Sequence, residues 1–272
     1  MPPVFALRVE GPDHHSRIVA HMEAPEPVCS EPVDAESATP ESATPGSATP
    51  GSARPESVRT GPLRELVDEL VTHVLAGLPE GRRTVVGLCG PPGAGKSRAA
   101  WLLMKALRRA GIAAGQAPMD GFHLSNRQLD ARGARARKGA PDTFDVAGYR
   151  NVLERIRARG SETIYAPDFS RRLDEPIAGV HAIAPEDRVV ITEGNYLLFD
   201  EGGWGEIRSL LDLSIYLDVP DPTLTRRLVH RHVANGRDDD QARDWVDNVD
   251  LPNAAAVARS RCRADLVWKP VP

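Results

Sequence analysis

The sequence of 272 residues has few cysteines, no long apolar run and little net charge. Its three cysteines lie far apart and form no CxxC or Cys/His spacing, which argues against a disulfide framework or a structural zinc site. There is no run of about 18 apolar residues, and the apolar patch at residues 4–7 is too short for a signal peptide. We therefore expect a cytoplasmic protein without a membrane partner. A formal net charge of −4 excludes a strongly basic nucleic-acid-binding protein.

The first part of the chain differs in composition from the rest. Residues 36–55 read ESATP, ESATP, GSATP, GSARP, a five-residue repeat without a large apolar side chain. Such a segment cannot bury enough surface to offset the entropy lost on folding, so we expect residues 1–59 to form a disordered arm. Composition favours a linker or an extension for this arm, and a partner-binding arm is the alternative.

Residues 60–272 alternate between strand and helix patterns. Apolar residues at helical spacing follow Thr60-Gly61-Pro62 and stop at Gly77. Further helical patterns cover residues 96–110, 147–159, 221–234 and 239–248, and short apolar runs predict strands at 84–89, 112–117, 163–166, 188–192, 213–219 and 264–268. Strands alternating with helices are typical of a parallel sheet covered on both faces, so we expect one α/β domain over residues 60–272.

The segment between the strand at 84–89 and the helix at 96–110 carries the pattern G-x-x-x-x-G-K-[ST]. It reads Gly90, Pro91, Pro92, Gly93, Ala94, Gly95, Lys96 and Ser97, with Arg98 next. Glycines let a backbone wrap around a polyphosphate, and a helix start directs its dipole and free amides at the anion. Lys96 supplies charge for the β- and γ-phosphates, and the Ser97 hydroxyl can bind Mg²⁺. Residues 90–98 are thus predicted to bind ATP and Mg²⁺.

Signatures of other nucleotide-binding classes are missing. No asparagine is followed by lysine, so the N-K-x-D motif of GTP switches is absent, and residues 124–128 lack the two glycines of the transport-ATPase signature. A carboxylate, Asp120, follows the strand at 112–117, where open α/β sheets bind ligands. A kinase acting on an alcohol needs such a carboxylate to orient the hydroxyl and accept its proton, although Asp-Gly is also a common turn pair.

Several further motifs follow in order. They are Asp120-Gly121-Phe122 with Asn126, residues 137–145 (RKGAPDTFD), 166–169 (APDF), 191–198 (ITEGNYLL) and 226–232 (RRLVHRH). Over residues 61–268 the chain resembles the group of uridine kinases, type I pantothenate kinases and phosphoribulokinases, and more closely a nucleoside/nucleotide kinase family labelled fructose-transport-system kinases. The resemblance implies a P-loop three-layer α/β sandwich with a parallel central sheet and a helical lid.

The resemblance also implies roles for individual residues. Asp120 would be the catalytic base, and Lys96 would act on the phosphates. Glu193 would assist Mg²⁺ together with Ser97, although a lone glutamate at a strand end is more often a solvated carboxylate. Arg227 and Arg231 would close over ATP from the lid, or form a solvated basic helix face, and Arg237 is a weaker candidate. The implied acceptor contacts are His123, Asn126, Arg137, Lys138, Asp168 and Asn195.

Residues 169–176 (FSRRLDEP) depart from the pantothenate kinase and uridine kinase patterns, so neither specificity carries over. We expect an ATP-dependent kinase that phosphorylates a hydroxyl of a small polar metabolite such as a nucleoside, a sugar or a pantothenate-like compound. It would have no nucleic-acid partner, and a homodimer is left open. A nucleotide-dependent switch or chaperone-like NTPase without a small acceptor is the alternative. A degenerate kinase used as a binding module is a third interpretation, which intact Lys96, Ser97, Asp120 and Glu193 oppose.

Overall fold

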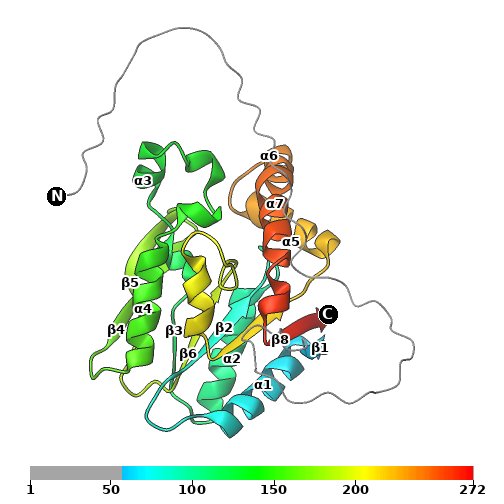
Figure 1. Ribbon diagram of the computed structural model, residues 1–272. Helices are drawn as coiled ribbons and strands as arrows, with labels where there is room; N and C mark the ends of the chain where they lie inside the picture. Colours follow the sequence, from blue (N-terminus) through cyan, green and yellow to red (C-terminus); the bar gives the residue numbers. More distant parts are fainter. Residues whose placement is uncertain (1–56, 272) are drawn as a thin grey trace, which may run out of the picture. The chain divides into compact units, whose positions relative to one another are not determined.

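The computed structural model describes residues 57–271, so the predicted disorder of residues 1–56 lies outside the described part of the chain. A six-stranded parallel sheet forms the centre, in the order β1-β8-β7-β2-β6-β3 (Figure 1). Its strands are β1 (Ser57–Pro62), β2 (Thr84–Cys89), β3 (Ala114–Gln116), β6 (Val189–Gly194), β7 (Leu213–Leu217) and β8 (Leu266–Val271). The parallel α/β sheet expected from the sequence is confirmed.

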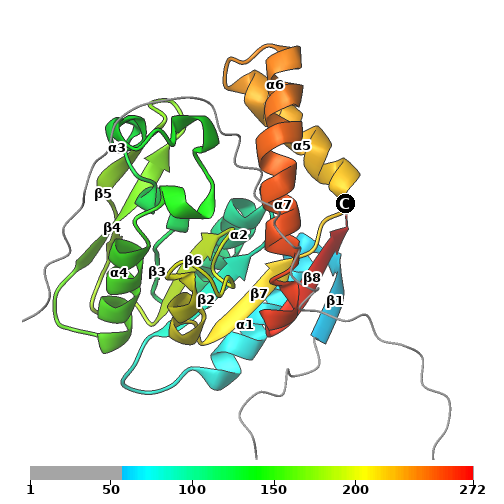
Figure 2. The same ribbon diagram turned by 45° about the horizontal axis from the view of Figure 1, so that its top comes forward.

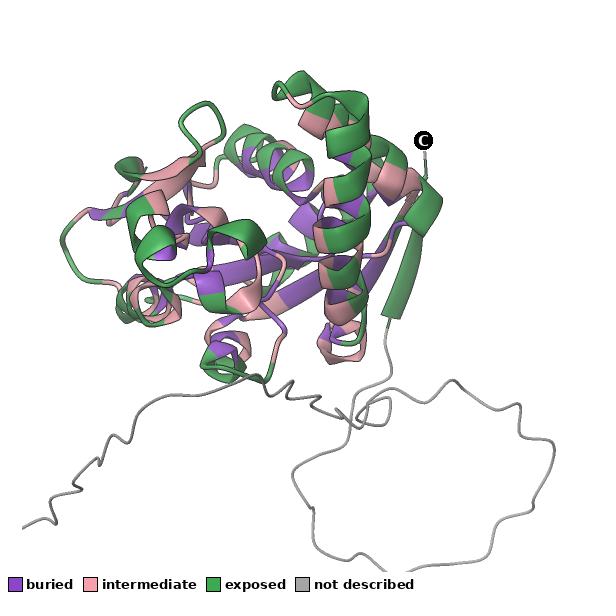
Figure 3. Cartoon of the chain, turned by 90° about the horizontal axis from the view of Figure 1, so that it is seen from above, coloured by how far each residue is buried: buried purple, intermediate pink, exposed green. Residues whose placement is uncertain are grey.

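Alternating side chains on the central strands build two separate cores. On β2, Val86 and Leu88 belong to one core, whereas Val85 and Cys89 belong to the other. The first core is covered by α1 (Leu63–Gly77), α2 (Lys96–Arg109) and α5 (Asp221–Ala234). The second is covered by α4 (Val146–Ala158) and a 3₁₀ helix at Trp204–Leu210. Figure 3 shows the central strands as a buried layer. The fold is the expected three-layer sandwich.

Two groups of elements extend past the carboxyl ends of the strands (Figures 1 and 2). One contains α3 (Asn126–Ala131) with the pair of strands β4 (Ile164–Ser170) and β5 (Glu175–Ile183). The other contains the end of α5, then α6 (Asp239–Trp245), a π-helical turn at Val246–Asp250 and α7 (Leu251–Ala258). Short 3₁₀ turns at Met119–Phe122, Arg135–Arg137, Pro141–Thr143 and Arg261–Arg263 complete the connections.

The strand predicted at 163–166 does not belong to the central sheet. It is part of β4, which pairs antiparallel with β5 in a two-stranded sheet. Ile164 and Ala166 are buried, while Tyr165 between them is exposed. A strand with one face in water is typical of antiparallel pairing, whereas a central parallel strand is buried on both faces. β5 was not predicted, because most of its residues are exposed and give no apolar pattern.

The strand β1 was also not predicted, and it includes residues 57–59 that the sequence assigned to the arm. It pairs with β8 at the edge of the sheet, from Ser57 opposite Leu266 to Pro62 opposite Val271. Nearly all of its residues are exposed, so it carries no apolar alternation. Its proline lies at the last position, where an edge strand tolerates the missing N–H donor.

Helices were located more accurately than strands. Helix α1 follows Pro62 and ends at Gly77 as predicted, and α2 begins at Lys96. The pattern at 239–248 covers α6 and the start of the π-helical turn, after which α7 continues. Within residues 57–271, no helix combines the length and apolar character needed to cross a membrane.

Candidate active site

Strand order brings three functional segments to one edge of the sheet. Strand β6 lies between β2 and β3. The P-loop (residues 90–97) follows β2, Glu193 lies near the end of β6, and Asp120 follows β3. Glu193 is paired in register with Leu88, one residue before the end of β2. Because parallel strands all end at the same edge, these groups lie around one opening of the sheet.

The P-loop depends on glycine where it passes β7. Gly90 has a φ of 142°, and a Cβ atom there would lie 2.8 Å from the Leu217 carbonyl oxygen. A larger residue would therefore push the loop away from the sheet. Gly95, just before α2, offers no side chain to cap the helix, so the first-turn N–H groups of α2 remain donors for a ligand.

The ammonium group of Lys96 is held at the mouth of this loop. Its Nζ donates hydrogen bonds to the carbonyl oxygens of Gly90 and Pro91, both at 2.9 Å, and to Oδ1 of Asn195 at 2.7 Å. Burial lowers the pKa of Lys96, while the charges of Glu193 and Asp120 oppose that shift. The ammonium is thus oriented before any phosphate arrives.

Ser97 and Glu193 present oxygen atoms beside Lys96, and together these three residues are called the phosphate wall below. The Ser97 hydroxyl donates to Oε1 of Glu193 at 2.8 Å. Burial, followed by the charge of Asp120, raises the pKa of Glu193 to about 7, and Lys96 and the Ser97 hydrogen bond oppose the shift. A hydroxyl and a carboxylate are hard oxygen donors, so this pair fits Mg²⁺.

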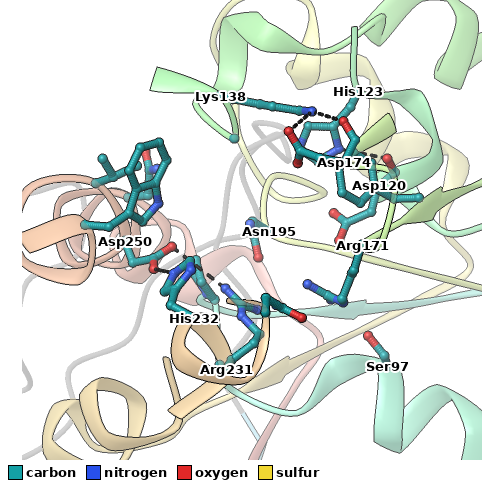
Figure 4. Close-up of a pocket in the computed structure, with 18 of the residues that line it drawn as sticks. Ser97, Asp120, His123, Lys138, Arg171, Asp174, Asn195, Arg231, His232 and Asp250 are labelled. Carbon is teal, nitrogen blue, oxygen red and sulfur yellow. Dashed lines mark hydrogen bonds and ion pairs between the residues drawn. The ribbon is translucent and has the colours of Figure 1, made fainter. Parts of the chain in front are cut away.

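Asp120 projects from the turn at Met119–Phe122 into the same cavity (Figure 4). The turn packs closely on β4: a Cβ atom on Gly121 would lie 2.4 Å from the Pro167 carbonyl oxygen, so only glycine fits there. The charge of Asp120 raises the pKa of both Lys96 and Glu193. Its carboxylate therefore faces the phosphate wall across the cavity.

A second wall, called the aromatic wall below, consists of His123, Phe144, Phe169 and Lys138. The His123 ring lies 4.0 Å from the Phe144 ring and 4.6 Å from the Phe169 ring, between centroids. Its Nδ1–H donates to the Asp120 carbonyl oxygen at 2.8 Å, because a carbonyl can only accept. Burial lowers the pKa of His123, so the ring is neutral at pH 7 and its Nε2 is a hydrogen-bond acceptor.

Lys138 ties the aromatic wall to the turn between β4 and β5. Its side chain is only 8% exposed and forms an ion pair of 2.9 Å with Oδ2 of Asp174. Nζ also donates to Oδ1 of Asn126 at 2.6 Å and lies 4.9 Å from the centroid of the Phe169 ring. The charge of Lys138 is therefore already compensated by protein groups.

A third wall comes from α5 and the π-helical turn, and is called the lid wall below. Arg227 donates to the Gly93 carbonyl oxygen at 3.2 Å. Arg231 lies 3.9 Å from Oδ1 of Asp250, whose other oxygen contacts Nε2 of His232 at 2.6 Å. Burial, and then the charge of Arg171, lowers the pKa of Arg231. The lid wall therefore carries positive charge toward the P-loop.

The three walls enclose a cavity of about 750 Å³, which most of the expected site residues line. These are Pro92, Gly93, Gly95, Lys96, Ser97, Arg98, Asp120, His123, Lys138, Glu193, Asn195, Arg227 and Arg231. Gly90, Pro91 and Ala94 form the buried inner side of the loop. Arg237, the weaker lid candidate, also lines the cavity and stacks on Trp245, with its guanidinium carbon 3.9 Å from the ring centroid.

Three of the expected acceptor contacts do not line the cavity. The Asn126 side chain accepts a hydrogen bond from Lys138 and donates one to the Asp174 carbonyl oxygen. Arg137 is exposed and forms an ion pair with Asp142. Asp168 accepts from the Phe169 amide at 2.7 Å and contacts His181 at 3.2 Å. Arg137 and Lys138 are adjacent in sequence but face opposite ways, because the 3₁₀ turn ends between them.

Several lining residues were not among the candidates. Arg171 and Asp174 lie in the segment that departs from the known kinase patterns; its charged residues suggest a polar acceptor, but neither residue was assigned a contact. His232, Trp245 and Asp250 line the lid side. Asp250 could not be found from the sequence, because its direction depends on the π-helical turn that ends with it.

A parallel sheet between two helical layers, with a P-loop and acidic residues at the neighbouring strand ends, defines a nucleotide-binding protein of the P-loop class. Residues 85–272 match the model described as "Phosphoribulokinase / Uridine kinase family", and the chain belongs to this family. The resemblance seen in the motifs is thus confirmed.

Individual relatives agree with the family. A crystal structure named "putative fructose transport system kinase" from Silicibacter sp. TM1040 is 42% identical with a TM-score of 0.69, covering 74% of this chain and 98% of that one. The "Uncharacterized protein YggC" of Escherichia coli (strain K12) is 37% identical over 75% of this chain and 86% of its own. The "Putative uridine kinase C227.14" of Schizosaccharomyces pombe is 32% identical over 74% of this chain and 88% of its own.

Proposed function

We propose that this kinase transfers the γ-phosphoryl group of ATP to a hydroxyl group of a small polar metabolite. The observation that carries this proposal is that the Asp120 carboxylate lines the same cavity as Lys96 and Ser97 (Figure 4). A carboxylate in this position can orient the acceptor hydroxyl and accept its proton, as a kinase requires.

The proposed step moves one phosphoryl group and one proton. The acceptor oxygen forms a bond to the γ-phosphorus, while the bond from that phosphorus to the β–γ bridging oxygen breaks and ADP leaves with the electron pair. The hydroxyl proton passes to the Asp120 carboxylate. Lys96 and the lid arginines Arg227 and Arg231 stabilise the charge on the transferred group, and positioning supplies much of the rate.

Ser97 and Glu193 are the residues that would hold Mg²⁺. When bound, the ion would neutralise charge on the β- and γ-phosphates. Its binding requires an ionised Glu193, and the buried carboxyl group gains a partner for its charge in return. The hydrogen bond between Ser97 and Glu193 keeps both oxygens close together before the ion arrives.

The aromatic wall is the proposed site of the acceptor. It offers ring faces together with the Nε2 acceptor of neutral His123, and Asn195 adds an amide at the centre of the cavity (Figure 4). This mixture suits a polyhydroxylated molecule such as a nucleoside or a sugar, which has apolar faces and hydroxyl edges. The expected roles of Arg137 and Asp168 in acceptor binding are not part of the proposal.

The test is an ATP-consumption screen with nucleosides, ketohexoses, glycerate and pantothenate, run on wild-type protein and on Asp120→Asn. We expect one acceptor class to stimulate turnover, and Asp120→Asn to lower this turnover about 10²- to 10⁴-fold, as for loss of a general base. Affinity for the nucleotide should change little. Asp142→Asn, an exposed carboxylate outside the cavity, is the matched control. Slow ATP hydrolysis that no acceptor stimulates would contradict the proposal. An equal loss of nucleotide affinity and turnover in Asp120→Asn would also contradict it.

A further inference from the structure

Arg171 reaches into the cavity from an element that the proposed mechanism does not use. It is the first residue of the turn between β4 and β5, and its side chain lines the cavity. In Figure 4 the guanidinium group lies below Asp120, above Ser97 and across from Arg231. Arg171 and Arg231 thus approach the space over the P-loop from opposite walls.

The guanidinium group of Arg171 has no counterion in the described chain. Among residues 57–271, no hydrogen bond or ion pair to this side chain is formed, whereas Arg227 contacts the Gly93 carbonyl and Arg231 contacts Asp250. Lys138, the cation of the aromatic wall, is likewise paired with Asp174. Arg171 therefore keeps its five N–H donors available for a ligand.

The charges around Arg171 indicate where that ligand lies. Arg171 lies across the cavity from Arg231 (Figure 4), and its positive charge is, after burial, the main cause of the lowered pKa of Arg231. Two arginines that repel each other across a cavity are stabilised together by an anion between them. In the proposed function the P-loop holds the triphosphate of ATP at this end of the cavity, and the γ-phosphate is the part that lies furthest from the nucleoside.

We propose that Arg171 contacts the γ-phosphoryl group of ATP, opposite Arg231, so that the two guanidinium groups clamp the group that is transferred. This inference rests on the proposed function, and it adds a phosphate contact from outside the P-loop and the lid. A guanidinium fork matches two phosphate oxygens at once, and the charge on these oxygens is what the reaction must stabilise. ADP lacks the group that Arg171 would contact.

The experiment compares Arg171→Gln with Arg172→Gln, the next residue of the same turn; both side chains are exposed, but only Arg171 lines the cavity. Calorimetry measures the affinity for adenylyl imidodiphosphate, which keeps a γ-phosphate, and for ADP, each with Mg²⁺. We expect Arg171→Gln to weaken the triphosphate analogue about 10- to 100-fold and ADP less than about twofold. Arg172→Gln should leave the ratio of the two affinities unchanged. Repeating the titrations at high salt removes long-range charge effects.

Other results would overturn the proposal. Equal weakening of both nucleotides would mean that Arg171 contacts a part that they share. No weakening would mean that Arg171 does not contact the nucleotide and that its charge acts on the acceptor. A change of similar size in Arg172→Gln would mean that the overall positive charge of the turn, and not a specific contact of Arg171, causes the effect. If Arg171→Gln is unstable, Arg171→Lys replaces it, and we expect an intermediate loss of affinity for the triphosphate analogue. Lys96→Ala separates the two proposals: if it weakens both nucleotides while Arg171→Gln changes neither, only the Arg171 contact fails.

Discussion

The phosphate wall and the aromatic wall of the cavity are assembled in different ways. Lys96 and Ser97 belong to one short loop, whose glycines and following helix orient it locally, and Glu193 joins them from the next strand. The aromatic wall combines His123, Lys138, Phe144 and Phe169, and a lysine–aspartate contact to Asp174 holds it to the β4–β5 turn. A substitution in the first wall should act on the nucleotide. One in the second should act on the acceptor and on the position of the neighbouring side chains.

The largest effect is expected at the centre of the phosphate wall. Lys96→Ala removes the ammonium group that three acceptors hold at the loop mouth. We expect turnover to fall at least about 10²-fold and nucleotide affinity to fall with it, because a preorganised charge is lost. Steady-state assays and calorimetry measure both. Lys105→Ala, on an outward position of the same helix, is the control, and unchanged turnover in Lys96→Ala would remove the P-loop from the mechanism.

Backbone geometry of the P-loop gives the next effect. Gly90→Ala places a Cβ atom 2.8 Å from the Leu217 carbonyl oxygen at a φ of 142°. We expect a loss of about 1–3 kcal/mol in the free energy of unfolding, together with weaker nucleotide binding. Gly111→Ala is the matched control, since Gly111 also has a positive φ but nothing within 4 Å of the added atom. Equal losses at the two sites in urea unfolding would contradict the predicted steric conflict.

Lys138 and Arg137 are neighbouring cations, and only Lys138 belongs to the aromatic wall, so comparing their variants tests what this wall contributes. Lys138→Met leaves Asn126 and Asp174 without their shared donor, so we expect a loss of about 1–2 kcal/mol in the free energy of unfolding and a raised KM for the acceptor. Arg137→Met removes an exposed contact to Asp142 and should change neither quantity measurably. Urea unfolding measures the stability of the two variants, and steady-state kinetics measures their KM for the acceptor. A larger effect at Arg137 would show that the wrong one of the two side chains had been assigned to the cavity.

The last effect, which involves no ligand, is a pH dependence of stability due to Glu193. Its pKa is about 7 in the folded protein against an ordinary value of 4.5, so the folded state binds the proton more tightly than the unfolded state. The stability that Glu193 contributes is therefore fully present below about pH 4.5 and is lost as pH rises through about 7.

We expect wild type to lose up to about 3 kcal/mol relative to Glu193→Gln between these pH values, without nucleotide or Mg²⁺. Unfolding curves from pH 4.5 to 8 measure the difference between the two proteins. A pH-independent difference would mean that Glu193 is already ionised in the folded protein.

Much of the phosphate wall could be predicted from the sequence because its geometry is local. The spacing of Gly90, Gly95, Lys96 and Ser97 along one strand–loop–helix unit determines where each group points. Asp120 and Glu193 each follow an apolar run that forms a strand of a parallel sheet, and the resemblance of the motifs around them to known kinases gave their expected roles. Neither step requires knowledge of distant contacts.

The edges of the fold and the aromatic wall were predicted less well. Strands β1 and β5 are largely exposed, so no apolar pattern marks them in the sequence. They are strands because β1 pairs with β8 and β5 pairs with β4. Arg137 and Asp168 were expected at the acceptor, but each is paired with a neighbour outside the cavity. Arg171 lines the cavity only because the hairpin of β4 and β5 turns beside the sheet.

The amino-acid sequence by itself determined the parallel sheet and the P-loop, since these depend on short-range patterns of glycine, charge and apolar spacing, and the resemblance of its motifs to known families gave the kinase class. Tertiary structure alone decided which of the many arginines face the cavity and which carboxylates are used in pairs. Long charged side chains reach their partners across elements that are distant in the chain, and their direction follows from packing, not from residue type.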